Sequence, residues 1–325
     1  MNAKLEILSF YLIPYDDKNK NITFGDLFQK KINSNKMKDV YQAIVNILDN
    51  PSDTSYKLEG KKAFTLLGRE SGYESKDDVV YGILKGGDLG NGKTKGKLSD
   101  KNDEENLDGN VINDKYFFLL YVPMNDYRGY LMFQSYKDEG IRKAFVKTIM
   151  KELFSRYKEY RVPKPETFFP QTIKDEFKKN AVVKELKFTD RQLSSSFSND
   201  TSFTSIAEGY KFEVRIVPIG GGFSPDSVAK VFSMVGLEIL GKKTLRRFGK
   251  KDVVVQNNVT KKTTHFELGK DFEGIKPRIY LANRIQFESN EIPNFESLKA
   301  YCLELLDDIK IEEENKIKNK RRNDS

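Results

Sequence analysis

The stretch from Gly87 to Thr94, GDLGNGKT, matches the pattern GxxxxGK(S/T), whose chemistry is the binding of nucleotide phosphates. In such a site the amides of a glycine-rich loop and of the following helix cradle the phosphates, and the lysine neutralises their charge. An expected strand, residues 79–84, precedes the pattern as the site requires. The sequence after Thr94, KGKLSDKND, has no apolar periodicity, so no helix is expected to begin there. We therefore favour a solvated Gly- and Lys-rich loop over nucleotide binding.

A second candidate constellation is Asp175, followed by Glu185-Leu-Lys187 on an expected strand, residues 182–188. This spacing is similar to that of metal-dependent nucleases of the PD-(D/E)xK type, which have an Asp and then Glu-x-Lys on the next strand. The resemblance implies that Asp175 and Glu185 hold Mg²⁺, which polarises phosphate and water, and that Lys187 stabilises charge. Asp175 falls on an expected helix, residues 172–179, instead of at a strand start. An amphipathic strand with a polar face is the other interpretation.

Positive charge is concentrated between residues 242 and 262. The chain has 56 Lys and Arg against 48 Asp and Glu, a net charge of +8, and eight cations against Asp252 alone give this segment +7. A basic segment with an aromatic ring and loosening glycines is typical of contact with a polyphosphate backbone. A solvated basic loop is the alternative. We predict that nucleic acid, DNA or RNA, contacts Lys242, Lys243, Arg246, Arg247, Phe248, Lys250 and Lys251.

Three glycines, Gly220 to Gly222, lie between an expected strand and a helix that begins at Ser224-Pro225-Asp226. Successive amides in such a turn can bind an anion. Here Asp226 would repel the anion and Pro225 lacks an amide donor. We therefore expect a turn that needs positive φ angles, for which glycine is the usual residue.

The single histidine, His265, and the single cysteine, Cys302, exclude several classes of chemistry. A mechanism that needs two histidines is impossible within one chain, and one cysteine forms neither an internal disulfide nor a thiolate cage. His265 is expected on a strand, half-buried or at an edge, and Cys302 on the apolar face of a helix. The catalytic groups that remain are carboxylates, lysines, tyrosines and the backbone. The other alternative is a protein that catalyses no reaction. No cofactor and no metal are predicted.

The apolar residues are too dispersed for a membrane span, because no run approaches the ~18 consecutive residues that one needs. The first ten residues show no basic region, long apolar run or cleavage site, so no export signal is expected. The expected compartment is a reducing cytoplasm, without membrane contact.

Apolar periodicity places the elements that must hold these residues. Strands are predicted at residues 5–13, 62–68, 79–84, 116–122, 130–134, 182–188, 210–217, 253–255, 265–268 and 278–287. Helices are predicted at 23–48, with a candidate break at Asn33-Ser34-Asn35, and at 141–157, 172–179, 224–240 and 295–309.

These elements predict an α+β protein of two domains, each a mostly antiparallel sheet covered by helices. The N-terminal domain is residues 1–160, with a mobile loop or hairpin tip at 86–110. A Pro-containing linker, 161–170, leads to a C-terminal domain, 171–311, and a charged tail, 312–325, expected to be frayed.

Three functions remain open. The first is a cytoplasmic nucleic-acid-binding protein without a catalytic site, a subunit of a larger bacterial assembly for defence or DNA processing. The second is a Mg²⁺-dependent nuclease that uses Asp175, Glu185 and Lys187. The third is a protein-interaction module whose aromatic-rich hairpin, Tyr116 to Phe133, binds a partner.

Overall fold

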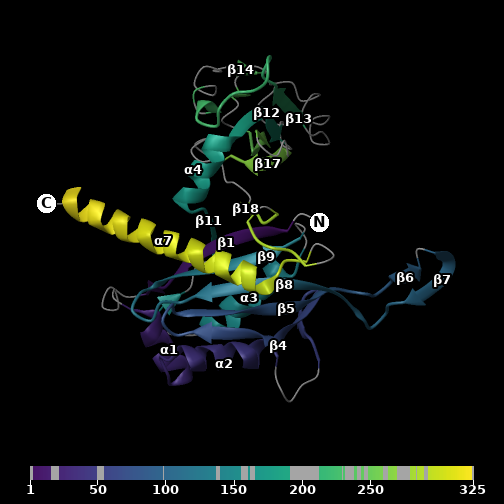
Figure 1. Ribbon diagram of the computed structural model, residues 1–325, viewed down its shortest axis with the longest axis vertical. Helices are drawn as coiled ribbons and strands as arrows, with labels where there is room; N and C mark the ends of the chain where they lie inside the picture. The colour runs from purple at the N-terminus through teal and green to yellow at the C-terminus, as the bar shows by residue number, and fades with distance from the viewer. Residues whose placement is uncertain are drawn as a thin grey trace, which may run out of the picture. The chain divides into compact units, whose positions relative to one another are not determined.

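The computed structural model describes most of the chain (Figure 1). The described residues are 3–15, 22–49, 55–97, 99–136, 140–154, 160–161, 165–190, 212–228, 230, 238–239, 243–244, 248–258, 263–268, 279–282, 284–288 and 292–323. The chain divides into two compact units, Met1–Phe168 with Ile279–Lys310 and Phe169–Arg278 with Ile311–Ser325. The predicted mixture of helices with mostly antiparallel sheets is confirmed. That each unit is an independent domain stays a prediction.

The first unit is built on a sheet whose paired strands are all antiparallel. Across the sheet lie β11 (Glu166–Phe168), β1 (Lys4–Tyr11), β9 (Arg128–Ser135), β8 (Val111–Tyr121), β5 (Val79–Leu89), β4 (Lys62–Glu74) and β3 (Lys57–Glu59). A further strand, β18 (Ile279–Tyr280), also pairs with β1, and β2 (Ile13–Pro14) pairs with β10 (Tyr160–Arg161). The expected linker 161–170 therefore contains a strand of this sheet, and the expected strand 278–287 is limited to two residues.

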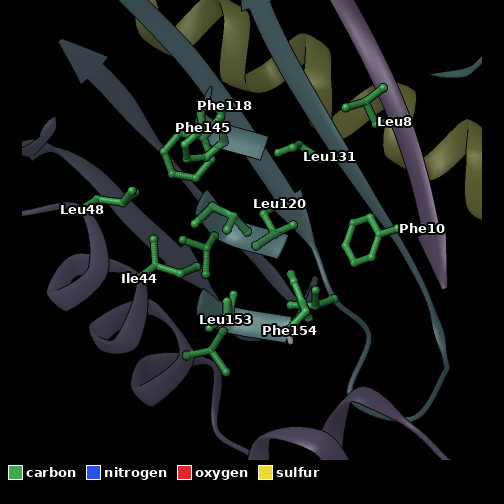
Figure 2. Close-up of a cluster of buried hydrophobic side chains, with 14 of the residues drawn as sticks. Leu8, Phe10, Ile44, Leu48, Phe118, Leu120, Leu131, Phe145, Leu153 and Phe154 are labelled. Atoms are coloured by element: carbon green, nitrogen blue, oxygen red, sulfur yellow. The ribbon is translucent and has the colours of Figure 1, made fainter. Parts of the chain in front are cut away.

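One face of this sheet is covered by α1 (Phe24–Ile32), α2 (Met37–Leu48), α3 (Arg142–Ile149) and a π-helical turn, η2 (Met150–Phe154). Thr23 and Asp26 form a reciprocal capping box that begins α1, and Asn33 ends it in the left-handed conformation, φ 56°. The candidate break is thus confirmed. Figure 2 shows the side chains of the buried cluster between sheet and helices, with Phe10, Phe118, Phe145 and Phe154 among them.

The opposite face is covered by the first half of α7 (Phe295–Asn323), which crosses the strands in Figure 1. The Phe295 ring contacts those of Tyr81 and Phe117, and Nζ of Lys299 lies 4.0 Å from the centre of the Tyr81 ring. The helix continues to Asn323 through residues expected to be frayed, where pairs one turn apart such as Lys316–Glu312, at 2.7 Å, support it.

The expected loop 86–110 is mainly a hairpin. β5 continues to Leu89, and β8 begins at Val111. Between them β6 (Thr94–Lys97) pairs with β7 (Asp100–Asn106), and the pair projects beyond the sheet in Figure 1. The alternative of a hairpin tip is the one that the structure adopts.

Asp78, in the turn before β5, gives a prediction for pH-dependent stability. Its carboxylate accepts a hydrogen bond from the amide of Met124 at 3.2 Å, and its φ of 53° is left-handed. Burial raises the pKa of Asp78, against the opposing effects of that hydrogen bond and of Lys310. Because the folded state then holds its proton more tightly than the unfolded state, the contribution of Asp78 to folding becomes less favourable as pH rises through its pKa.

Asp78→Asn is expected to raise the free energy of unfolding at pH 7, since Asn keeps the acceptor, tolerates the left-handed backbone and carries no buried charge. The gain should shrink as pH falls through the raised pKa of Asp78, where the parent carboxyl becomes protonated. Urea unfolding at several pH values measures this, with Asp77→Asn as the control that loses contacts to Lys76 and Lys310. A less stable Asp78→Asn protein at pH 7 would contradict the assignment.

The second unit contains a smaller antiparallel sheet in the order β13 (Phe212–Ile216), β12 (Ala181–Asp190), β16 (Lys250–Asn257) and β17 (Thr263–Glu267). It also contains α4 (Gln171–Asn180) and a short pair, β14 (Glu238–Ile239) with β15 (Lys243–Thr244). The apolar side chains of one sheet face form its core, namely Val183, Leu186, Phe188, Val253 and Val255, with Val228 and Phe248. Nine of the seventeen residues of the expected helix 224–240 lie outside the described residues, and at its expected end Glu238 and Ile239 form the strand β14 instead.

None of the helices in the described part of the chain has a stretch long and apolar enough to cross a membrane.

Candidate functional site

The glycines of the phosphate-loop pattern have structural roles in the hairpin. Gly87 pairs with Asn113 in the ladder between β5 and β8, and a Cβ atom there would lie 1.9 Å from the carbonyl oxygen of Ile112. A Cβ atom at Gly90 would lie 2.3 Å from the carbonyl oxygen of Leu107. Gly92 has a φ of 72°, as its turn requires. Close strand approach and a turn therefore explain all three.

The arrangement after these glycines also differs from a phosphate site. Thr94 begins the strand β6 where the site needs a helix. The amide of Gly92 donates to the Asp108 carboxylate at 2.6 Å, and this bond holds the pKa of Asp108 below its usual value. The hydrogen bond of this amide of the pattern is thus already made to a carboxylate. Among the described residues the pattern has no helix N-terminus to cradle a phosphate.

The residues of the candidate nuclease site lie on two different elements. Asp175 is on the helix α4, whereas Glu185 and Lys187 are on the strand β12 and form ion pairs there. Asp175 is exposed on α4 and accepts from the Gln171 side chain at 2.7 Å. Glu185 pairs with Arg215 at 3.4 Å, and Lys187 pairs with Glu213 at 2.9 Å. No group of three or more His, Cys, Asp or Glu residues able to hold a metal occurs in the described part of the chain. The amphipathic strand is the interpretation that this geometry favours.

The polar face of the small sheet is rich in charges of both signs. Register places Arg215 opposite Lys187, Lys187 opposite Asp252, and Asp252 opposite Glu267. Lys250 pairs with Asp252 at 2.9 Å. Because the cations are matched by carboxylates, this face has little excess positive charge of its own to attract a polyanion.

The predicted nucleic-acid segment is only partly described. Lys242, Arg246 and Arg247 lie outside the described residues, and Lys243 is in the two-residue strand β15. The side chain of Lys250 is 60% exposed. Lys251 is only 7% exposed and lies on the core side of β16, in phase with Val253. Lys251 is thus poorly placed to contact a large ligand.

Phe248 occupies the core of the second unit. It is 4% exposed, and its ring meets that of Phe188 edge-on, with centroids 5.9 Å apart. A buried ring offers no free face to a base, so the stacking role expected for it would require the ring to leave this core. The signal for burial in the sequence is its position close before an apolar strand.

The glycine turn at residues 220–222 behaves as expected. All three glycines have positive φ angles, of 90°, 110° and 117°. The Lys184 ammonium donates to the carbonyl of Gly221, and Phe223 forms a bridge with Val183. The turn therefore presents a carbonyl to a cation, which is the opposite of an anion site.

Neither the single histidine nor the single cysteine is seen beside a catalytic partner in the described part of the chain. His265 lies on β17 opposite Val254. Cys302 is completely buried on α7, as predicted, and burial raises the pKa of its thiol well above the usual value. A buried, neutral thiol is a core residue rather than a nucleophile.

The aromatic-rich hairpin, the candidate partner surface, lies in the middle of the large sheet. Tyr116, Phe117, Phe118 and Phe133 are all at most 4% exposed. They contact helices and strands of their own unit, so these four rings offer little surface to a partner, and the interaction module stays a prediction. Beside Phe117, however, is a feature that no sequence pattern indicates, a pocket of about 180 Å³ in the first unit.

The pocket combines apolar walls with a few polar groups. Ile83, Phe117, Phe295 and Leu298 contribute apolar surface, and the polar residues are Glu70, Lys115, Gln134, Tyr136 and Glu288. Lys115 pairs with Glu70 at 3.1 Å. These residues are contributed mainly by four strands, by the start of α7 and by the segment that leads into it, so no local pattern could predict their meeting.

No family model matches the chain, and a search of curated proteins finds no similar sequence.

Proposed function

We propose that the protein binds nucleic acid through residues 242–250, as a non-catalytic subunit of a larger bacterial assembly that acts in defence or DNA processing. The observation that supports this most is the charge of the segment. Residues 242–262 contribute +7 of the net +8 of the chain. Release of counterions from the phosphate backbone makes such a cluster favourable for binding DNA or RNA regardless of sequence.

The structure on both sides of the segment supports a clustered contact. Lys243 is held in β15, paired with Ile239, and Phe248 is packed in the core immediately before β16. Arg246 and Arg247 lie between Lys243 and Phe248 in the sequence, and Lys242 and Lys250 lie just outside them. In this proposal Phe248 anchors the segment, and the phosphate contacts are made by Lys242, Lys243, Arg246, Arg247 and Lys250.

A catalytic role has less support than binding. Glu185 and Lys187, the residues of the nuclease alternative, are each paired with a charge on β13. Losing such pairs in order to bind Mg²⁺ has an electrostatic cost that a dedicated metal site avoids. The nuclease therefore remains the second candidate, distinguishable by Mg²⁺-dependent cleavage that Glu185→Gln abolishes.

The experiment is a salt titration of binding to single- and double-stranded DNA and RNA. Changing Lys242, Lys243, Arg246, Arg247 and Lys250 to Gln should weaken binding to all sequences about equally. Each lost phosphate contact lowers the slope of log K against log salt by ~0.9 on duplex DNA or ~0.7 on single strands. Three contacts would flatten the duplex slope by about 2–3 units.

The matched control removes five exposed lysines of the first unit, namely Lys30, Lys36, Lys38, Lys76 and Lys95. It changes the net charge equally and should retain most of the affinity and slope. Equal effects of the two variants would mean that only net charge matters. No binding by the parent at low salt would overturn the proposal.

A further inference from the structure

The pocket of the first unit has a buried donor on its wall. Gln134 is 2% exposed, and its Oε1 accepts from the amide of Phe117 at 3.1 Å. That bond fixes the orientation of the side-chain amide, so the Nε2 group is the remaining donor. Nε2 makes no hydrogen bond of normal geometry with the described residues, although Gln134 lies close to the hydroxyl of Tyr136, whose pKa burial raises. A buried donor without an acceptor is costly, and a ligand that supplies the acceptor removes that cost.

The size and walls of the pocket suit a single aromatic ring. The rings of Phe117 and Phe295 meet at 5.7 Å and 64°, which gives one continuous apolar wall, and Ile83 and Leu298 extend it. The volume is about 180 Å³. An apolar cavity of roughly 150 Å³ accepts benzene, so a six-membered ring is of the right size.

The remaining polar groups specify what such a ring must carry. Glu70 and Glu288 provide carboxylate oxygens, and Lys115, the cation of the pocket, is paired with Glu70. Carboxylates accept hydrogen bonds and favour a ligand N–H over a ligand carbonyl. The ligand therefore carries an acceptor for Gln134 and an amino group for a carboxylate.

From this combination we infer that the pocket binds a cytosine ring, with its carbonyl oxygen on Gln134 Nε2 and its amino group on the carboxylates. Glu accepting from the amino group of cytosine is a known mode of base recognition. Uracil has a carbonyl at the corresponding position, which would face the carboxylates and be repelled. The ring can come from a free nucleoside or from an unpaired base in a single strand. The inference does not depend on the basic segment.

Isothermal titration of the full chain with cytosine, cytidine and uridine tests the pocket. Saturable binding of cytosine or cytidine is expected, about tenfold tighter than uridine, because the uracil carbonyl cannot donate to the carboxylates and would face their oxygens. A comparison of cytidine with oligocytidylate then distinguishes the free nucleoside from a base in a strand. Absence of saturable binding by cytosine and cytidine would overturn the inference and leave a pocket that holds only water.

Two variants locate the binding. Gln134→Leu removes the donor, and Glu70→Gln, at the partly exposed side of the pocket, weakens the acceptor without touching the core. Each should lower cytidine affinity at least about fivefold. Glu104→Gln, on the exposed strand β7, is the matched control and should not change it. Cytidine binding unchanged in both pocket variants, or abolished by neutralising residues 242–250, would place the ligand elsewhere and overturn the inference.

Discussion

Phe154→Ala is expected to lower the free energy of unfolding of the first unit by about 3–5 kcal/mol. Phe154 ends the π-helical turn after α3 and is 1% exposed. Its ring lies 5.1 Å from that of Phe10, 5.8 Å from that of Phe24 and 6.0 Å from that of Phe28. It therefore joins β1 and α1 (Figure 2), and its removal leaves a cavity that these rigid rings fill only partly.

Urea unfolding measures the effect, and Cys302 provides a reporter within the same unit. Because Cys302 is completely buried, a thiol reagent can label it only when α7 separates from the sheet. Phe154→Ala should accelerate labelling and lower the midpoint together. Tyr127→Ala, at a side chain that is 48% exposed, is the control and should change both little. A Phe154→Ala protein as stable as that control would show that the aromatic cluster is not the core.

Local signals in the sequence predict many of these elements. Alternation along residues 212–216 and the apolar period of residues 295–309 each reflect one buried face, so strand and helix follow from the pattern. The Thr23 cap and the Asn33 break are also local, because each depends on residues within one turn. Each of these features can be predicted without knowing which other helix or strand it packs against.

Pairing between distant segments could not be predicted in this way. Both β11 and β18 pair with β1, and the first half of α7 completes the unit that contains β1. Strands of two or three residues carry too few side chains for a period to be visible. The sequence therefore suggests a linker where the structure has the strand β11, and it groups α7 with its neighbours in the chain.

The candidate sites also differ in whether they depend on neighbouring or on distant residues of the chain. That Glu185 and Lys187 are neutralised depends on the register of β12 with β13, which sets Glu213 and Arg215 beside them. The pocket depends on residues from Glu70 to Leu298. The basic segment, by contrast, is contiguous in the chain, so its charge can be recognised from the sequence alone. The burial of Phe248 has only a weak signal in the sequence, its position close before an apolar strand, because its packing partner Phe188 is distant in the chain.

Gly87→Ala is expected to destabilise the first unit by about 1–3 kcal/mol, whether or not a nucleotide is present. The new Cβ atom would lie 1.9 Å from the carbonyl oxygen of Ile112, so the ladder between β5 and β8 must separate locally. Gly68→Ala is the matched control, because no atom lies within 4 Å of its added Cβ atom. It should be neutral or stabilise by up to about 1 kcal/mol, through the lower entropy of the unfolded chain.

The parent and its Gly87→Ala variant also test whether residues 87–94 bind a nucleotide. If residues 87–94 bound a nucleotide, ATP or GTP at 100 times Kd would stabilise the parent by about 2.7 kcal/mol, and Lys93→Ala would remove that gain. We expect neither, since Lys93 lies 3.9 Å from Asp88 and Asp108 occupies the Gly92 amide. Melting temperatures of the parent, Gly87→Ala and Lys93→Ala with and without nucleotide measure both effects. If nucleotide raised the melting temperature of the parent and Lys93→Ala abolished that rise, residues 87–94 would be a phosphate-binding loop. The close approach of the strands at Gly87 would then not be the main reason for its glycines.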